Sequence, residues 1–457
     1  MELKELLKEF GISCSEAEYY AFRKKMILDN WNNFINDCMN QQIVIQNKID
    51  ALGITIPNGT VGKEYNVSFS IPSDLVEDFW LDGIDELGLT CNIDDDNKCT
   101  IYGQPLKDGS FELRLSYKYK GWMDGRPILE RKFIFSVNPD PKSLWKSIPT
   151  PQEIEYYQPD SEHEYVQIDG ENGEPQKNVV VASQRGRSHA HEGRPRDDHF
   201  KVKYLEESGW YILAVADGAG SAKYSRKGSI LACEASVQHC EQFFSDSKSI
   251  HDFEDYICTY NSENGDEYKK LLGDYIYKLV GNAAFDGYKA INAEATDHGS
   301  PIKDYATTLL LVVCKKFDFG WFVASFWVGD GAICIFDKDR QYFKILGTPD
   351  EGEFAGQTRF LTMPEIFRDA ASFYGRLKFS IEQDFTALML MTDGVSDPMF
   401  ETDANLNKIE KWNELYESIT REVDLSDNNS ESQFQLLKWL DFWSQGNHDD
   451  RTIAILY

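Results

Sequence analysis

The hydrophobic residues of positions 1–52 recur at mixed spacings of three and four, which is the period of a helix with one apolar face. They run from Leu3 and Leu6 to aromatic residues such as Tyr20, Trp31 and Phe34. We expect this segment to form a helical hairpin or cap. An aromatic stripe of this kind more often packs against another element than binds a ligand, so we interpret it as a packing face.

Residues 56–138 change to short runs in which apolar and polar residues alternate, separated by Gly, Asp and Pro. This pattern predicts a small β-sandwich. The next segment, residues 139–177, is polar and rich in proline, which favours a linker. We therefore expect a helical segment and a β-sandwich before the linker, and one large domain after it.

Residues 178–457 combine strand-like apolar runs with longer helical stretches, and the two do not alternate strictly. This order predicts an α/β (α+β) fold in which helices cover largely antiparallel sheets, rather than a Rossmann fold. The glycine-rich signatures of nucleotide-binding loops are absent from the sequence, which weakens a nucleotide-binding function.

Four short acidic motifs in this large segment follow apolar runs: VADG at Asp217, VGDG at Asp330, MTDG at Asp393 and NHDD at Asp449 and Asp450. An apolar run predicts a buried strand, and Asp-Gly at its end predicts the turn that follows. Carboxylates held together in a region of low dielectric repel one another, and hard divalent cations such as Mg²⁺ or Mn²⁺ relieve that repulsion. The motifs therefore predict a metal site that the fold must assemble from distant segments.

Composition narrows the class of protein. The 457 residues carry a formal charge of -29, which argues against nucleic acid or an anionic membrane as the main partner. No apolar stretch approaches the length of about 20 residues that a membrane helix needs, and the N-terminus lacks the apolar core of a signal peptide, so we expect a cytoplasmic protein. Nine cysteines without a C-x-x-C pair favour reduced thiols, although Cys91 and Cys99 could meet across a hairpin.

The order of motifs in the large segment resembles that of the type 2C metal-dependent serine/threonine protein phosphatases. The matching motifs are RPRDDHF (194–200), VADGAGSAKYSRKGS (215–229), TTLLLVV (307–313), WVGDGAI (327–333), TDGVSD (392–397) and DDRTIAIL (449–456). The resemblance implies a layered αββα domain over residues 178–457 with a central antiparallel β-sandwich, and it is closer to a divergent bacterial branch than to the eukaryotic enzymes. Residues 56–138 resemble the immunoglobulin-like modules of bacterial multidomain proteins, which implies a spacer or recognition module.

The same resemblance implies a role for each acidic residue. Asp217 would bridge two Mg²⁺ or Mn²⁺ ions, and the carbonyl group of Gly218 would bind one of them. Asp393 and Asp449 would complete one ligand set, so that Asp217 and Asp393 form the catalytic core. The remaining ligands would be Asp197 at the second metal with Asp198 in support, and Asp330 and Asp397 at a third, weaker ion.

Two departures from the family pattern concern other functional groups. The histidine that often follows the first Asp-Gly is Ala219 here, and the phosphate-binding arginine position is Gly193. Arg187, Arg194 and Arg196 are the candidates for the phosphate, because a guanidinium group can bind it through two hydrogen bonds. We expect the nearby His189 and His191 to be ordinary solvated loop residues.

The predicted function is hydrolysis of phosphoserine and phosphothreonine in proteins by a metal-activated bridging hydroxide, with a phosphoprotein as substrate and a cognate kinase as its counterpart. Two alternatives stay open. One is a catalytically weak pseudophosphatase that serves as a scaffold, and the other is a hydrolase of a small phosphate ester on the same fold. We also expect residues 347–363, which are polar and rich in turn formers, to act as a flap beside the site.

Overall fold

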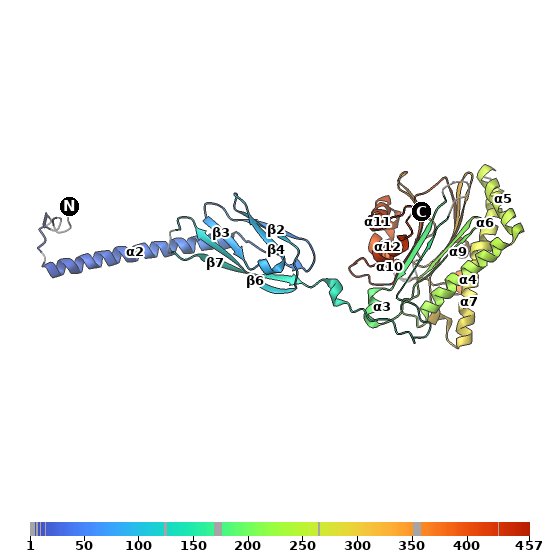
Figure 1. The fold of residues 1–457 in the computed structure, drawn as a ribbon, viewed down its shortest axis with the longest axis horizontal. Coiled ribbons are helices and arrows are strands. Elements are labelled where there is room, and N and C mark those ends of the chain that lie inside the picture. Colours follow the sequence, from blue (N-terminus) through green and yellow to red (C-terminus); the bar gives the residue numbers. More distant parts are fainter. Residues whose placement is uncertain are drawn as a thin grey trace. The chain divides into compact units, whose positions relative to one another are not determined.

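The computed structural model describes residues 5, 8–9, 11–13, 15–122, 126–168, 176–263, 266–350, 358–427 and 429–457. The chain divides into two compact units, Met1–Leu144 and Trp145–Tyr457 (Figure 1). Each unit has its own hydrophobic core and is described separately below.

The first unit begins with one continuous helix, α2 (Glu16–Ala51). Ser15 starts it with a capping box, in which the Ser15 side chain and the Glu18 side chain each accept a hydrogen bond from the other's backbone N–H. The expected helical hairpin is wrong, because residues 16–51 contain no glycine or proline that could break the helix. The expectation that the aromatic stripe is packed is also wrong for most of its length within this unit, since Tyr20, Trp31 and Phe34 are about half exposed.

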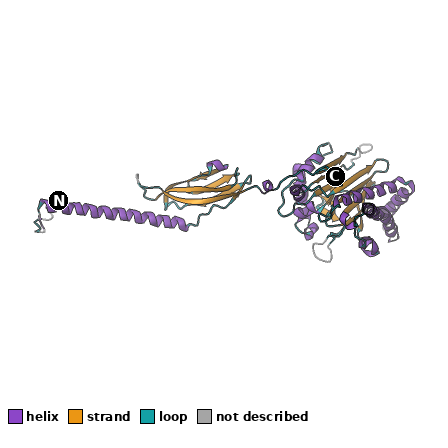
Figure 2. Cartoon of the chain, turned by 90° about the horizontal axis from the view of Figure 1, so that it is seen from below, coloured by secondary structure: helices purple, strands orange, loops and turns teal. Residues whose placement is uncertain are grey.

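The rest of the first unit is β-rich, as predicted (Figure 2). A four-stranded sheet has the order β1-β7-β6-β3, and a three-stranded sheet has the order β2-β5-β4. Alternating side chains such as Leu113, Leu115 and Phe135 are fully buried in the core. The strands are β1 (Gly59–Thr60), β2 (Tyr65–Ser70), β3 (Val76–Asp82), β4 (Leu89–Ile93), β5 (Lys98–Gly103), β6 (Gly109–Tyr119) and β7 (Leu129–Asn138).

Cys91 on β4 and Cys99 on β5 lie close together, as the hairpin pattern suggested. Their sulfur atoms are 3.0 Å apart, and both residues are free thiols in this structure. In the part of the chain that the structure describes, no helix combines the length and the apolar character needed to cross a bilayer.

Two antiparallel sheets form the centre of the second unit, which confirms the mixed α/β class. The five-stranded sheet has the order β10-β11-β12-β13-β16, and the six-stranded sheet has the order β15-β14-β17-β18-β9-β8. Their strands are β8 (Ser161–Val166), β9 (Val179–Gln184), β10 (His199–Leu205), β11 (Trp210–Ala216), β12 (Leu309–Phe317), β13 (Gly320–Val328), β14 (Ala332–Asp337), β15 (Tyr342–Ile345), β16 (Leu377–Glu382), β17 (Ala387–Met391) and β18 (Arg451–Leu456).

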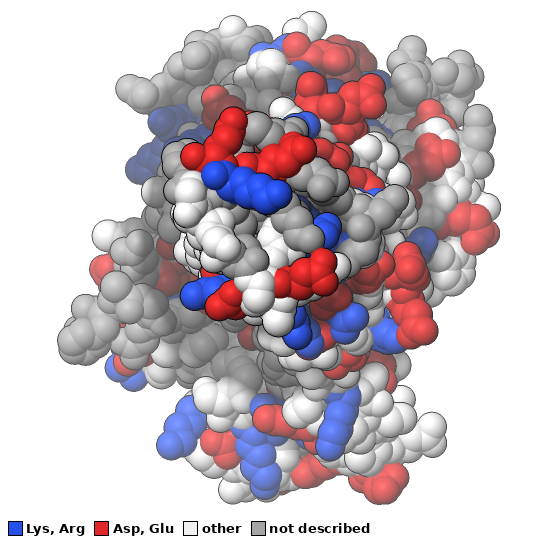
Figure 3. All heavy atoms as spheres, turned by 90° about the vertical axis from the view of Figure 1, so that its left-hand side faces the viewer, with Lys and Arg blue, Asp and Glu red and all other residues white. Residues whose placement is uncertain are grey.

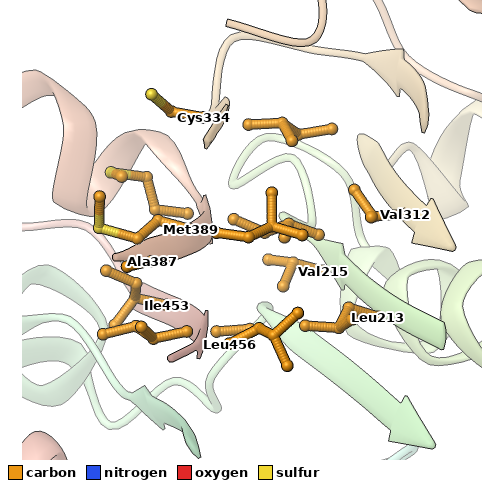
Figure 4. Packing of buried hydrophobic residues seen from close by; sticks show 14 of the residues in the cluster. Leu213, Val215, Val312, Cys334, Ala387, Met389, Ile453 and Leu456 are labelled. Carbon is orange, nitrogen blue, oxygen red and sulfur yellow. The ribbon is translucent and has the colours of Figure 1, made fainter. Parts of the chain in front are cut away.

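The two sheets pack face to face through buried aliphatic side chains. Leu213 and Val215 of β11 and Val312 of β12 pack with Met389 of β17 and Ile453 of β18 (Figure 4). Strands buried on both faces need nearly continuous apolar sequence, which is why runs such as WYILAVA and GWFVASFWV stand out in the chain.

Helices cover the outer faces of the two sheets (Figures 1 and 2). On the five-stranded sheet, α4 and α7 pack against each other, and their buried side chains join those of β11–β13 in a second core cluster. On the six-stranded sheet, α12 packs against β8 and β9. The helices of this unit are α3 (Arg187–Glu192), α4 (Ser225–Ser245), α5 (Ser247–Glu263), α6 (Asp266–Ile276), α7 (Asn282–His298), α8 (Glu365–Arg368), α9 (Ala370–Gly375), α10 (Asp393–Phe400), α11 (Ile409–Glu422) and α12 (Ser432–Trp439).

The segment expected as a linker contributes to the second unit. Residues 161–166 form β8, an edge strand paired with β9, and the Ile148 N–H donates to the carbonyl group of Ala190. The sequence SEHEYV hides this strand because an edge strand with one solvated face tolerates charged residues. Residues 169–175 of the expected linker, and residues 351–357 of the expected flap, lie outside the described residues.

Candidate metal centre

Acidic side chains from both sheets meet at one end of the β-sandwich in the second unit. Asp217 follows β11 and Asp330 follows β13 in the five-stranded sheet, while Asp393 follows β17 and Asp449 precedes β18 in the six-stranded sheet. These positions lie hundreds of residues apart in sequence. The antiparallel order of the strands brings their ends together.

The centre of the cluster consists of Asp217, Asp330 and Asp393. Each contributes a carboxylate oxygen, and these oxygens all lie within 4.8 Å of one another. Burial raises the pKa of Asp217 and of Asp393 well above the usual range, and the neighbouring carboxylates raise it further. Such a group of acids is held together by the fold against its own repulsion.

The backbone of Asp217 is fixed by two threonines at the start of β12. Its N–H donates to Thr308 Oγ1 at 2.8 Å, and its carbonyl oxygen accepts from the Thr307 hydroxyl and the Thr308 N–H, both at 2.8 Å. The next residue, Gly218, packs so closely that a Cβ atom there would lie 2.6 Å from the carbonyl oxygen of Asp197. Glycine is therefore required for the second motif segment to approach the first.

Asp393 begins α10, directly after the N-cap residue Thr392. Gly394 lies against the NHDD motif, and a Cβ atom at this position would collide with the carbonyl oxygen of Asp450. Asp449 accepts a hydrogen bond from the N–H of Asp450 at 2.8 Å. The charge of Asp449 raises the pKa of both Asp217 and Asp393, so it belongs to the same electrostatic group.

Asp198 lies completely buried behind the cluster. Its Oδ2 atom accepts hydrogen bonds from the Thr392 hydroxyl at 2.9 Å and the Thr452 hydroxyl at 2.7 Å. Burial, followed by the charge of Asp450, raises its pKa to about 7 despite these donors. The residue is placed to support Asp217 rather than to reach solvent.

Asp197 takes a different direction from Asp198. Its carboxylate lies 3.6 Å from the Arg194 guanidinium, 3.8 Å from that of Arg226 and 3.8 Å from His189 Nε2. Burial raises its pKa to about 6, with Asp450 adding to the shift. The structure thus places Asp197 among cationic groups beside the three-carboxylate centre, and Arg226 is a neighbour that the sequence analysis missed.

His189 is buried, so the expectation of a solvated loop residue is wrong for it. Its Nδ1 atom lies 3.1 Å from each carboxylate oxygen of Asp450. Burial lowers the pKa of His189, but the charge of Asp450 outweighs this effect and raises the pKa to about 9. His189, Asp449 and Asp450 also form a second group whose ligand atoms lie within 4.8 Å of one another.

The three candidate phosphate arginines differ in their surroundings. Arg196 is fully buried and donates to Ser183 O, Gln158 and Glu162, which leaves it closed to a phosphate in this structure. Arg187 is held by Asp441 and lies over the ring of Trp443. The Arg194 side chain is 40% exposed and donates to the carbonyl group of Gly220 in the DGAG loop, so it borders the cluster.

Asp330 and Asp397 lie on the outer side of the cluster. The Thr358 hydroxyl donates to Asp330 Oδ2. Asp397 stands one helical turn after Asp393, and burial followed by the charge of Asp330 raises its pKa to about 6. Beside them is a cavity of about 750 Å³ lined by Arg359, Asp403 and the ion pair of Asp350 with Arg376, among others.

The donor set fits a hard divalent cation. Among the described residues, oxygens of Asp197, Asp198, Asp330 and Asp393 are buried without a hydrogen-bond partner. Unpaired buried carboxylate oxygens are costly, and oxygen donors are what Mg²⁺ and Mn²⁺ prefer. Asp217, Asp330 and Asp393 would hold such an ion, with Asp449 in reach of the same group.

Comparisons with known proteins were made at three levels. A family model described as protein phosphatase 2C matches residues 185–441, which is more than half of the chain. No curated protein matched.

Solved structures with the same architecture include three phosphatases. The catalytic domain of the serine/threonine phosphatase PstP of Mycobacterium tuberculosis, in complex with two manganese ions, is 14% identical, with 62% of this chain and 97% of that chain covered and a TM-score of 0.36. PppA of Pseudomonas aeruginosa is 12% identical, with 64% and 99% covered and a TM-score of 0.34. A phosphatase 2C from Toxoplasma gondii is 12% identical, with 65% and 98% covered and a TM-score of 0.39.

Proposed function

The chain belongs to the protein phosphatase 2C family, and from this membership we propose that it hydrolyses phosphoserine and phosphothreonine in proteins with the help of Mg²⁺ or Mn²⁺. The observation that carries the proposal is the group of Asp217, Asp330 and Asp393, whose oxygens lie within 4.8 Å of one another at the meeting point of two sheets. A scaffold without metal would gain nothing from keeping these repelling charges together.

Divalent ions held there would lower the pKa of water and neutralise charge that develops on a phosphate. The residues of the chain do the rest. Asp217 is fixed by Thr307 and Thr308, and Asp198 is fixed by Thr392 and Thr452, so that the carboxylates keep their positions when a substrate enters. Preorganisation of this kind removes the cost of reorienting the groups during the reaction.

Arg194 is the residue that we propose for holding the phosphate. Its guanidinium group borders the DGAG loop and is the most open of the three candidate arginines. With Ala219 after the first Asp-Gly, the proton for the leaving group would come from water in the site rather than from a side chain at that position. The substrate would be a phosphoprotein whose kinase is a separate enzyme, and residues 56–138 would serve as an immunoglobulin-like spacer or recognition module.

A substrate panel tests this function. Wild type is compared with Asp217→Asn and Asp393→Asn on p-nitrophenyl phosphate and on a phosphothreonine peptide, with Mn²⁺, with Mg²⁺ and with EDTA. We expect metal-dependent turnover of both substrates that is lost in both variants. Asp318→Asn, on the exposed turn between β12 and β13, is the matched control and should keep full activity.

Two results would contradict the proposal. Metal binding by calorimetry without turnover of any substrate would favour a scaffold. Turnover of small esters without turnover of phosphopeptides would favour a small-molecule hydrolase on the same fold.

A further inference from the structure

The free part of α2 carries a stripe of exposed apolar side chains. The α2 stripe consists of Tyr20, Ile27, Leu28, Trp31, Phe34, Ile35 and Met39, whose side chains are between 38% and 61% exposed. At 100° per residue these positions fall within one side of the helix. Monomeric soluble proteins rarely leave such a continuous apolar surface uncovered.

The stripe continues a face that the first unit already uses for packing. Further along the same side of α2, Gln42 donates to the Tyr119 hydroxyl at 3.3 Å, Ile45 packs against the core and Ile49 is fully buried in it. The sheets cover only this C-terminal end of the helix, and α2 extends beyond them (Figure 1). The N-terminal half thus presents a packing face without a partner in its own unit.

We propose that the α2 stripe pairs with the α2 stripe of a second copy of this chain, in an antiparallel arrangement centred on Trp31. Residues equally distant from Trp31 then face one another: Leu28 of one copy lies opposite Ile35 of the other, and Ile27 lies opposite Phe34. Large apolar residues meet large apolar residues at every one of these levels. The overlap from Tyr20 to Gln42 would be about 35 Å long at a rise of 1.5 Å per residue.

The area of the stripe suits such an interface. Large side chains expose roughly 150–250 Å² when free, so seven of them at about half exposure offer roughly 700 Å² of surface. A stable pair of proteins typically buries about 800 Å² on each partner. The stripe with its bordering polar atoms reaches that size.

Charge and geometry select the antiparallel orientation. Lys24 lies within the stripe, and a parallel pair would place Lys24 against Lys24, whereas the antiparallel pair places it opposite Met39. A parallel pair would also carry the contact into Ile45 and Ile49, which the unit's own sheets already cover. In the antiparallel pair the two sets of sheets lie at opposite ends of the helices.

An anionic lipid surface is a poorer occupant. Such a surface attracts a continuous basic area. On the side from which α2 projects, the described Lys and Arg side chains lie among Asp and Glu (Figure 3). Phe22 and Met26 on the opposite side of α2 would stay exposed in a two-helix pair, so the mass of the assembly is part of the test.

Sedimentation equilibrium of the full chain tests the proposal without reference to enzyme activity. We expect wild type to reach the mass of two chains as its concentration rises. Leu28→Glu with Ile35→Glu buries two unpaired charges in the pair and should weaken association by about 100-fold or more. Asn33→Glu with Asn40→Glu adds the same charge on the opposite side of α2 and should associate like wild type, with circular dichroism confirming equal helix content.

Orientation is tested with a photo-crosslinking residue at position 28. Crosslinks to peptides around Ile35 of the other copy would support the antiparallel pair, and crosslinks to peptides around Leu28 would overturn it. A wild type that stays monomeric at all concentrations, a mass above two chains, or equal association of the two double variants would each overturn the proposal. Co-sedimentation of monomers with anionic vesicles would assign the stripe to a membrane instead.

Discussion

The imidazole of His189 and the carboxylate of Asp450 form a buried pair, with Nδ1 lying 3.1 Å from each of the two carboxylate oxygens. Asp450 also accepts the N–H of Gly186 at 2.6 Å and the N–H of Asp197 at 2.5 Å. Burial raises the pKa of Asp450, but His189 and these donors more than reverse the shift. One carboxylate therefore fastens three chain segments around the acidic cluster.

The first prediction concerns this pair. Asp450→Asn keeps the size of the side chain but removes the charge that His189 and two backbone donors use. Losing one partner of a buried ion pair costs about 3–5 kcal/mol, so we expect the free energy of unfolding to fall by that order. Urea denaturation measures it. Asp297→Asn, on the exposed part of α7, should change stability by less than about 0.5 kcal/mol, and an equal loss in both variants would contradict the role of the pair.

The second prediction separates charge repulsion from metal binding. Asp217→Asn removes one of three mutually repelling carboxylates, so the metal-free variant should be at least as stable as the metal-free wild type. Mn²⁺ should stabilise wild type by about 2.7 kcal/mol at 100 times its dissociation constant and should have little effect on the variant. Thermal unfolding with and without metal measures both differences, with Asp318→Asn as the control. Equal stabilisation of variant and wild type by Mn²⁺ would rule Asp217 out as a ligand.

The third prediction concerns the ion pair beside Asp330. Arg376 Nη2 lies 2.8 Å from Asp350 Oδ1, and Asp350 accepts the N–H of Gly329 at 3.0 Å, so the pair anchors the residue before Asp330. Arg376→Met should lower stability by about 3–5 kcal/mol because a buried charge loses its partner. The double variant with Asp350→Asn should be less unstable than the sum of the single changes. Lys132→Met, in an exposed pair with Glu112, should cost at most about 1 kcal/mol, and strict additivity at the buried site would contradict the coupling.

The fourth prediction is a pH dependence in the first unit. Burial raises the pKa of Tyr65 from 10.0 to about 12, so folding favours the neutral phenol. Its contribution to stability is complete below pH 10 and is lost as the pH rises towards 12. Tyr65→Phe removes the hydrogen bond to Pro57 O and should be less stable at neutral pH, but the gap in urea midpoint to wild type should narrow above pH 10. Tyr102→Phe, which is 45% exposed, should show no such narrowing, and a constant gap for Tyr65→Phe would refute the shift.

The motifs allowed the acidic cluster to be predicted because each of them is local. An apolar run, Asp and Gly follow directly in sequence at Asp217 and Asp393, and the turn they predict is the turn that the structure contains. The surroundings of His189 could not be predicted in this way. Its partner Asp450 lies 261 residues away, and only the antiparallel pairing of β9 with β18 brings the two segments together.

A similar limit applies to α2 and β8. The period of three and four residues predicts that α2 is a helix, but it does not say which element covers the apolar side. In β8, the run SEHEYV has too few apolar residues to predict a strand, and its pairing with β9 stabilises it. Long-range contacts decide both cases.

The last prediction distinguishes the arginines near the site. Arg194→Ala should raise the KM for a phosphopeptide by about 10- to 100-fold, because a hydrogen bond to a charged group contributes about 1.5–3 kcal/mol. Its effect on stability should be small, since the side chain is 40% exposed. Arg187→Ala should leave KM unchanged, because that guanidinium group is held by Asp441. Arg196→Ala should mainly destabilise the fold, since it removes the buried donor to Ser183 and Glu162. Steady-state kinetics together with urea denaturation separate the three outcomes, and an unchanged KM for Arg194→Ala would remove it as the phosphate ligand.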